Sequence, residues 1–175
     1  MYLQTRRLLL RKFQEADFAD FHAYANDPEM CRMMGRDDMS DPAAARFTFD
    51  WLKDREERGY ALVLLSTGRV IGNLTVTAAS PGVVRHPVLE NKRGCALSFS
   101  LSRQYQRRGL MEEALRAVLE RLLGPEGMDY VNCGHFSFNH ASEALQKKLG
   151  FTPLLTEQVE TAEGPVLCIE NILFA

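Results

Sequence analysis

The sequence lacks the features that mark a membrane span, a metal centre or a disulfide framework. Its longest apolar run, Tyr60–Leu65, is far shorter than the roughly 20 residues that a helix needs to cross a bilayer, and no charged-then-apolar signal segment opens the chain. The 4 histidines are scattered, and the 4 cysteines form no Cys-x-x-Cys pair: Cys31, Cys95, Cys133 and Cys168. We therefore expect no membrane partner, no metal site, and buried thiols in a reducing cytoplasm.

A large excess of one charge is also missing. The chain has 21 Lys and Arg against 23 Asp and Glu, a formal net charge of −2, which does not suggest nucleic acid as its main partner. Its 175 residues, 46% of them hydrophobic, suit one domain (1–175) with a sizeable core. No internal repeat and no linker divides that domain.

The first part of the chain predicts a strand, two helices and a hairpin. A strand lies within Gln4–Phe13 and a helix over Glu15–Asn26, with Asp27-Pro28 as its stop. Asp41 and Pro42 form an N-cap and first-turn pair for a helix to Arg58. Its apolar face carries Ala44, Phe47 and Trp51. The stretch Met30–Ser40, with Asp37 and Asp38, has no clear period and is interpreted as a connector or a substrate loop. Tyr60–Leu65 and Val70–Thr77 form a hairpin.

The second part predicts strands and helices in alternation, closed by a hairpin. After a long link, Ala78–Gly94, a strand over Cys95–Leu101 buries Leu97, Phe99 and Leu101 on one face. A helix then starts at Gly109 and is followed by a short strand at Tyr130–His135. A second helix begins after Asn139 and buries a face with Ala141, Leu145 and Leu149. Thr152–Val159 and Val166–Phe174 pair at the end. The mixed order predicts an α/β fold with a mixed sheet, unlike the strict alternation of a doubly wound fold.

The junction Gln106-Arg107-Arg108-Gly109 has the chemistry of a phosphate cradle. A glycine at a helix start lets backbone N–H groups approach a ligand, and the unpaired N–H groups and positive dipole end of the helix attract anions. The two arginines add positive charge. By itself this pattern is also compatible with plain architecture.

Two segments resemble the GNAT superfamily of acyl-CoA-dependent N-acetyltransferases. The run Gln106–Leu110 is similar to the family's Gln/Arg-x-x-Gly-x-Gly/Ala motif, with Met111 where Gly or Ala is usual. Asn139-His140-Ala141-Ser142, followed by Leu145, Lys148, Leu149, Gly150 and Phe151, resembles its Asn-x-x-Ala/Ser … Lys-Leu-Gly-Phe segment. The opening Thr5–Arg11 resembles the first strand of the ribosomal-protein N-terminal acetyltransferase branch.

The resemblance implies a GNAT fold, with Cys95–Leu101 and Tyr130–His135 as a central parallel pair that splays to admit the pantetheine arm of acetyl-CoA. It also implies backbone N–H donors for the oxyanion near Ser98 and Phe99. In the ribosomal-protein branch, the serine at the position of Ser142 serves as the catalytic acid. The residues expected to bind the cofactor are Phe99, Leu101, Gln106, Arg107, Arg108, Gly109, Leu110, Met111, Asn139, Ser142 and Lys148.

Several roles stay open. Many relatives carry a glutamate base where this chain has Ala96, so Glu90, His135 or a water chain are alternatives, and Gln146 stands where many relatives have a tyrosine acid. Asn139 and Ser142 also suit a plain helix start. The acceptor is a primary amine, either a protein N-terminus or a small molecule, and the donor is acetyl-CoA or a longer acyl-CoA. We expect a cytoplasmic monomer or homodimer; a non-catalytic acyl-CoA-binding or regulatory module is the alternative function.

Overall fold

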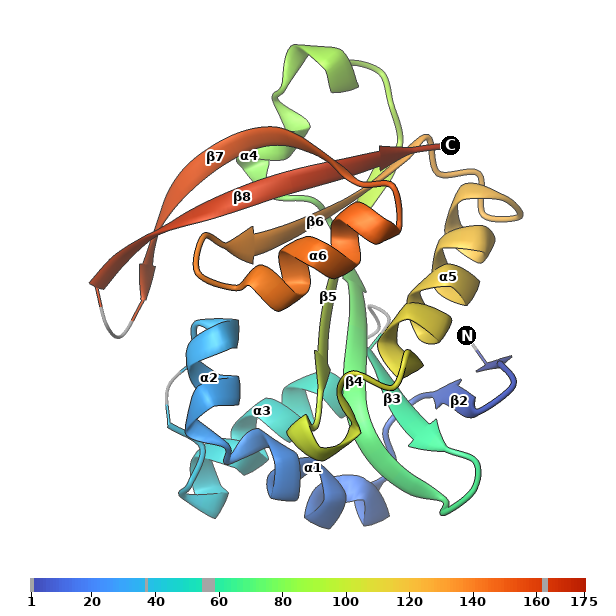
Figure 1. Cartoon of the computed structure of the whole chain (residues 1–175), viewed down its shortest axis with the longest axis vertical. Helices are drawn as coiled ribbons and strands as arrows, with labels where there is room; N and C mark the ends of the chain where they lie inside the picture. The colour runs from blue at the N-terminus through green and yellow to red at the C-terminus, as the bar shows by residue number, and fades with distance from the viewer. Residues whose placement is uncertain (1, 37, 55–58, 162–163) are drawn as a thin grey trace. The chain divides into compact units, whose positions relative to one another are not determined.

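The computed structural model describes residues 2–36, 38–54, 59–161 and 164–175. These residues form two compact units, and three elements have residues in both: β4 (Arg69–Thr77), β5 (Gly94–Leu101) and α5 (Leu110–Leu123). The first unit holds residues 1–75 and 99–115, and the second holds residues 76–98 and 116–175. Each unit is described by itself below, with the element labels of Figure 1.

The first unit contains an antiparallel meander. It is made of β1 (Leu3–Gln4), β2 (Leu8–Arg11), β3 (Gly59–Leu64) and most of β4 (Arg69–Thr77). Leu8 and Leu10 alternate with half-buried neighbours on β2 and are fully buried, as the period of a strand with one core-facing side requires. The predicted hairpin of β3 and β4 is confirmed.

Helices cover the start of this unit: a 3-10 turn at Glu15–Asp17, then α1 (Phe18–Ala25), α2 (Pro28–Met34) and α3 (Pro42–Asp54). The predicted stop at Asp27-Pro28 is confirmed, since α1 ends at Ala25. The pair also starts α2, which the sequence did not predict. The Asp27 side chain accepts hydrogen bonds from the N–H groups of Glu29 and Met30, and Pro28 occupies the first turn. Gly35, with φ of 61°, ends α2 in the left-handed conformation. The start of the supposed connector is therefore helical.

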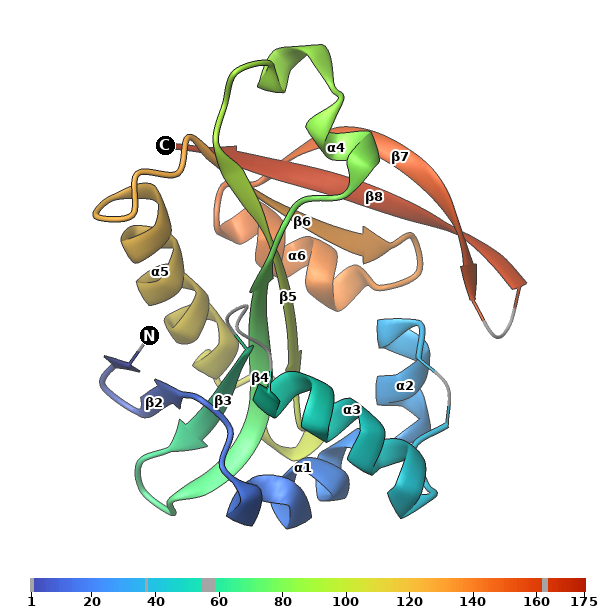
Figure 2. The ribbon, with the colours of Figure 1, turned by 180° about the vertical axis from the view of Figure 1, so that it is seen from behind.

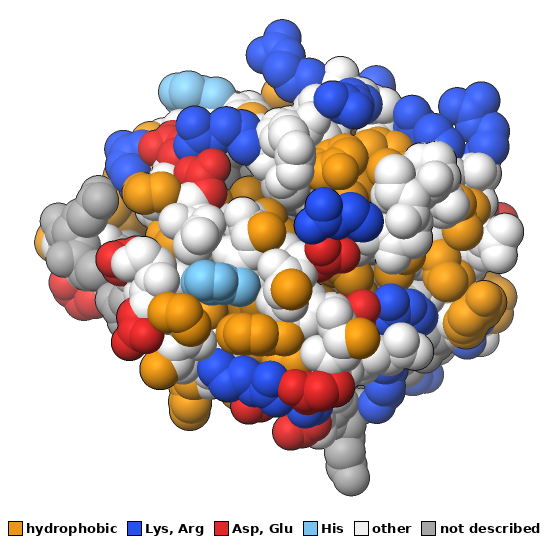
Figure 3. All heavy atoms as spheres, turned by 90° about the horizontal axis from the view of Figure 1, so that it is seen from below, with side chains coloured by type: hydrophobic (Ala, Val, Ile, Leu, Met, Phe, Trp, Pro, Cys, Tyr) orange, Lys and Arg blue, Asp and Glu red, His pale blue; other side chains and the backbone are white. Residues whose placement is uncertain are grey.

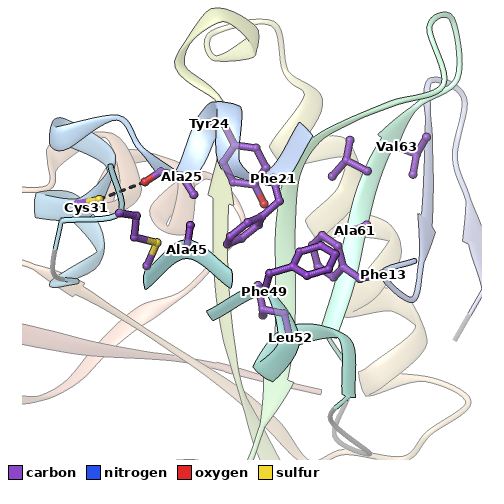
Figure 4. Close-up of a cluster of buried hydrophobic side chains, with 12 residues drawn as sticks. Phe13, Phe21, Tyr24, Ala25, Cys31, Ala45, Phe49, Leu52, Ala61 and Val63 are labelled. Carbon is purple, nitrogen blue, oxygen red and sulfur yellow. Dashed lines mark hydrogen bonds between the residues drawn. The ribbon is translucent and has the colours of Figure 1, made fainter. Parts of the chain in front are cut away.

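The predicted apolar face of α3 is wrong, because a neighbouring face of the helix is the buried one. Phe47 is 78% exposed and Trp51 41% exposed, whereas Ala45, Phe49 and Leu52 are buried. The predicted set and the buried set both have helical spacing, so the spacing alone cannot tell which face is buried. Contacts with other elements decide it. Phe49 lies against Phe13 and Phe21 (Figure 4). It also meets the Phe18 ring edge to face. The predicted capping by Asp41 is confirmed, since its carboxylate accepts from the N–H of Ala43 at 2.9 Å; residues 55–58 of the predicted helix lie outside the described residues.

The end of β5 (Gly94–Leu101) lies very close to β4 in the first unit. A Cβ atom on Gly72 would lie 2.3 Å from the carbonyl oxygen of Ser100, so only glycine fits there. The Ser100 hydroxyl and the Tyr24 phenol both donate to the Asn73 side chain, whose amide nitrogen is buried without a partner among the described residues. The prediction that β5 buries one face only is wrong here, because Ser100 and Ser102 are buried and Phe99 is half-buried.

The second unit is built on the start of β5, β6 (Tyr130–Phe136), β8 (Gly164–Phe174) and β7 (Thr152–Thr161). β5 and β6 pair in parallel, and β8 pairs antiparallel with both β6 and β7. Helix α6 (His140–Lys148) contacts β6, and α4 (Pro81–Val84) contacts β7 (Figure 2). The predicted link 78–94 therefore contains helical turns. A small core joins Val83, Leu89, Tyr130 and Ile172.

The strand pairings give one mixed sheet of eight strands in the order β1-β2-β3-β4-β5-β6-β8-β7. Helix α5 (Leu110–Leu123) follows β5, and its first six residues belong to the first unit. The predicted fold class, a mixed sheet flanked by helices, is confirmed. Within the described residues, no helix combines the length and apolar character of a membrane span, and no group of three or more His, Cys, Asp or Glu side chains is placed to hold a metal ion. In Figure 3, acidic and basic side chains lie among apolar ones on the face shown.

Candidate functional site

The segment between β5 and α5 exposes the backbone groups that the cradle requires. Arg107 and Gly109 have φ angles of 58° and 70°, and the segment 106–109 is exposed. Among the described residues, no group accepts a hydrogen bond from the backbone N–H of Arg107, Arg108 or Gly109. A Cβ atom on Gly109 would meet only the Arg7 guanidinium, at 3.6 Å. Glycine therefore adopts the positive φ at 109 without the strain that a side chain would add, and the space beside it is open.

Side chains from the start of the chain hold this segment in place. Glu113 in the first turn of α5 accepts hydrogen bonds from Thr5 Oγ1 at 2.6 Å, from the Arg7 N–H at 2.8 Å and from Arg7 Nε at 2.7 Å. Burial opposes ionisation of Glu113, but these bonds outweigh it and keep its pKa below the ordinary value. The other end of Arg7 donates to the carbonyl oxygen of Arg108 at 3.0 Å. Arg7 thus neutralises a carboxylate that would otherwise repel an anion at this helix start.

The predicted cofactor residues of this unit do not all face solvent. Leu110 and Met111 are buried, at 4% and 6% exposure, so only their backbone atoms can contact a ligand. The side chain of Gln106 donates to the Leu101 carbonyl at 2.9 Å and so closes the turn. Leu101 is buried and Phe99 is half-buried. The two arginines are exposed, with Arg108 over the Tyr105 ring.

In the second unit, the parallel pairing of β5 with β6 is short. It covers Gly94–Ala96 against Tyr130–Asn132, and the next described residues of β5 in this unit, Leu97 and Ser98, have no partner on β6. Two parallel strands that stop pairing leave backbone N–H and C=O groups open at their carboxyl ends, where ligands of open sheets usually bind. Ala96 and Asn132 form the last pair.

Asn139 and Ser142 stand at the start of α6. The Asn139 side chain accepts from the Ser142 N–H at 3.1 Å, which makes it an N-cap. Ser142 is half-buried. At the other end of this helix Lys148 is exposed, as is Glu90 after α4.

A buried hydrogen-bond network behind Ser142 was not anticipated. Gln146, only 1% exposed, donates from Nε2 to Ser142 Oγ at 2.9 Å and to the Gly134 carbonyl at 3.4 Å. The Asn171 amide donates to Gln146 Oε1 at 2.8 Å and lies 2.9 Å from His135 Nδ1. The predicted buried face of α6 is therefore wrong in part, because Ala141 is exposed and Gln146 takes the most buried position.

The network fixes the roles of its members. Because the amide nitrogen of Asn171 can only donate, His135 Nδ1 accepts, and the ring proton lies on the other nitrogen. Burial lowers the pKa of His135, so the ring stays neutral. His135 thus has no free lone pair for a base. Ser142 Oγ accepts from Gln146, which leaves its hydroxyl hydrogen for another acceptor.

A carboxylate also lies near the last β5–β6 pair. Glu170 on β8 accepts from Asn132 Nδ2 at 2.6 Å, and Cys168 Sγ donates to it at 3.6 Å. Sequence reasoning missed this glutamate because it follows no motif and comes from the closing hairpin, far along the chain from β5. The pairing of strands alone brings it here.

The comparison with protein families decides the identity of the fold. The model of the acetyltransferase (GNAT) domain matches residues 7–152. The chain belongs to the GNAT acetyltransferase family. A search of curated proteins finds no match.

Solved GNAT structures share the fold of this chain at low sequence identity. A GNAT-family acetyltransferase from Bacillus anthracis has a TM-score of 0.83 and 14% identity, over 99% of this chain and 98% of that one. A ribosomal-protein-S5-alanine acetyltransferase from Vibrio fischeri has a TM-score of 0.77 and 14% identity, over 99% and 96%. A GCN5-related N-acetyltransferase from Brucella melitensis has a TM-score of 0.84 and 11% identity, over 99% and 78%. These likenesses support the GNAT fold predicted from the two motifs.

Proposed function

We propose that this GNAT protein transfers an acetyl group from acetyl-CoA to a primary amine, either a protein N-terminus or a small molecule. The observation that carries the proposal is the orientation of Ser142. Its Oγ accepts from Gln146 at 2.9 Å, so its hydroxyl hydrogen is available to a leaving group. In a plain helix start, the backbone N–H of Ser142 donates to the capping side chain of Asn139, as it does here. Capping alone does not require a buried glutamine that donates to the Ser142 hydroxyl.

The described residues suit the cofactor that the family uses. In the first unit, the unpaired N–H groups of Arg107–Gly109 and two exposed guanidinium groups provide donors and positive charge for a pyrophosphate. Burial of Met111 accounts for its presence in place of Gly or Ala, because its side chain belongs to the core and its backbone stays in the helix start. When bound, acetyl-CoA supplies the activated thioester.

The residues of the second unit then have defined tasks. Unpaired backbone N–H groups after Ala96 would stabilise the oxyanion that forms as the amine attacks. Ser142 would donate its hydroxyl proton towards the departing sulfur as negative charge develops there. Gln146 and Asn171 would hold that hydroxyl in one orientation.

The test has two steps. Calorimetry first measures binding of acetyl-CoA. Release of free thiol is then followed with a panel of amines: peptides beginning with Ala or Ser, amino-acid amides and polyamines. We expect thiol release that depends on the amine, and mass spectrometry should show one added acetyl group on the acceptor. Butyryl-CoA in the same assay tests for a longer acyl chain. Tight binding without thiol release for any amine would favour the non-catalytic module.

A further inference from the structure

We propose that Glu170 is the proton acceptor for the attacking amine, supplied from β8 in place of a carboxylate at Ala96. This inference rests on the proposed function. It assigns a catalytic role to a residue outside both family motifs.

The strand registers place Glu170 on the same face of the sheet as Ala96. Ala96 pairs with Asn132, and on the neighbouring strand Gly134, two residues further along β6, pairs with Glu170. Paired residues point to the same face, as do residues two apart on one strand. His135 follows Gly134 on β6 and Asn171 follows Glu170 on β8, so both point to the other face. There Asn171 donates to His135 and to Gln146 of α6. The two faces therefore carry different groups, Glu170 on one and Ser142 with its network on the other.

Gly134 lets the Glu170 carboxylate extend over β6. A Cβ atom at 134 would lie 2.7 Å from Glu170 Oε1, so the carboxylate would have to move, and 3.0 Å from Cys168 Sγ, a tight contact. The absent side chain leaves the space that the carboxylate fills. Asn132 then holds the carboxylate beside the last β5–β6 pair, through its 2.6 Å bond to Oε2.

Asn132 offers a further group for an amine. It is only 2% exposed, and its Oδ1 has no hydrogen-bond partner among the described residues. A buried carbonyl oxygen without a partner is costly and calls for an explanation. An ammonium group has several N–H donors, so it can donate to Asn132 Oδ1 and to Glu170 together. The pair thus forms an acceptor site of matching chemistry at the end of the pairing.

The surroundings of Glu170 make its carboxylate a stronger base. Burial is the main effect and raises the pKa of Glu170, the bonds from Cys168 and Asn132 oppose it, and the negative charge of Glu157 on β7 raises it again. The nearby thiols stay neutral, since burial raises the pKa of Cys168 to about 12 and also raises that of Cys133. A carboxylate whose pKa lies nearer the working pH is a better general base.

The proposed step balances as follows. Glu170 takes one proton from the ammonium, which leaves a neutral amine with a lone pair. The amine nitrogen forms a bond to the thioester carbonyl carbon, and the carbon–sulfur bond then breaks. The sulfur takes a proton from Ser142, the nitrogen releases its second proton to solvent, and Ser142 regains one proton from solvent. Glu170 finally releases its proton to solvent, so the products are the amide, free CoA thiol and one proton.

The experiment compares Glu170→Gln with Glu160→Gln, which removes an exposed carboxylate from β7 and is a matched change of charge. Turnover is measured as thiol release with the fastest peptide of the Ala and Ser panel, with acetyl-CoA affinity by calorimetry and folding by thermal unfolding. Because a positioned general base contributes about 10²–10⁴-fold, we expect Glu170→Gln to lower kcat/KM by about 10²-fold near neutral pH. Acetyl-CoA affinity should be unchanged. Glu160→Gln should match the wild type.

The pH dependence separates proton transfer from mere support of the fold. In the wild type, kcat/KM should rise with pH as Glu170 loses its proton, and this limb should be missing in Glu170→Gln. A peptide N-terminus has an ordinary pKa of about 7.7–8.0, so at higher pH the amine is already neutral and the defect of Glu170→Gln should shrink to a few-fold. Glu170→Asp, which keeps the carboxylate, should recover part of the activity.

The outcomes distinguish the two proposals. If the wild type acetylates the peptide and Glu170→Gln stays within about twofold of it, the role of Glu170 is overturned while the acetyltransferase function stands. A defect that is constant across pH, or equal in Glu160→Gln, also overturns it. A wild-type protein that binds acetyl-CoA but acetylates no amine overturns both proposals.

Discussion

Replacing Gln146 with leucine tests the buried network of the second unit. Leucine is close to glutamine in size but has no polar atoms. The change therefore keeps the volume of a residue that is 1% exposed and removes its bonds to Ser142, Gly134 and Asn171. No motif marks this glutamine, so the prediction depends on the tertiary contacts alone.

The expected cost comes from the partners that lose a bond. The Asn171 amide keeps His135 but loses Gln146 Oε1, and the Gly134 carbonyl loses a longer bond. A buried polar group left without a partner costs about 1–3 kcal/mol, and the more apolar leucine offsets part of this. We expect a net loss of about 1–2 kcal/mol in the free energy of unfolding, or a fall in Tm of about 2–8 °C for a chain of this size.

The assay is urea and thermal unfolding of Gln146→Leu, with Lys147→Leu as the control. Lys147 is the exposed neighbour on the same helix, so its replacement should change stability little. The double variant Gln146→Leu, Asn171→Leu should lose less than the two single losses added, because neither partner is then left unpaired. A Gln146→Leu variant as stable as the wild type, or simple additivity in the cycle, would refute the network as described.

Three further changes test the rest of the structure. Gly109→Val should weaken CoA binding in calorimetry, because a β-branched residue does not tolerate a φ of 70°; unchanged affinity in a folded variant would count against the cradle. Ser142→Ala should lower turnover by about 10²-fold, the lower end for a proton-transfer group, with CoA affinity preserved; wild-type turnover, or a larger loss in Gln146→Leu, would contradict its role. Gly72→Ala should destabilise the first unit by about 1–3 kcal/mol, since its Cβ would lie 2.3 Å from the Ser100 carbonyl; an unchanged unfolding midpoint would disprove that close contact of β4 with β5.

The sequence by itself determined the type and order of most elements, and the two family motifs. Local rules suffice for these features. Asp41 before Pro42 starts a helix, Asn139 caps another, and glycine adopts the positive φ at 109 without strain. Such effects act within a few residues, so the pattern of residue types is enough to predict them.

The choice of helix face was not determined locally. On α3, the sets Ala44, Phe47, Trp51 and Ala45, Phe49, Leu52 both have helical spacing, and only contact with other elements of the first unit buries the second set. On α6 a polar residue, Gln146, is the most buried because Asn171 of β8 satisfies its amide. Hydrophobic periodicity cannot predict such a position, since a buried polar side chain depends on a partner distant in sequence.

The tertiary structure alone decided where the carboxylate of the second unit lies. The sequence showed that the usual carboxylate base is missing at Ala96 and offered Glu90, His135 or a water chain as replacements. Glu90 is exposed, whereas burial lowers the pKa of His135 and its Nδ1 accepts from Asn171. Glu170 lies beside Asn132 because β8 pairs with β6 in a register that sets it opposite Gly134. Register between strands far apart in the chain is set by the whole sheet and not by any local pattern.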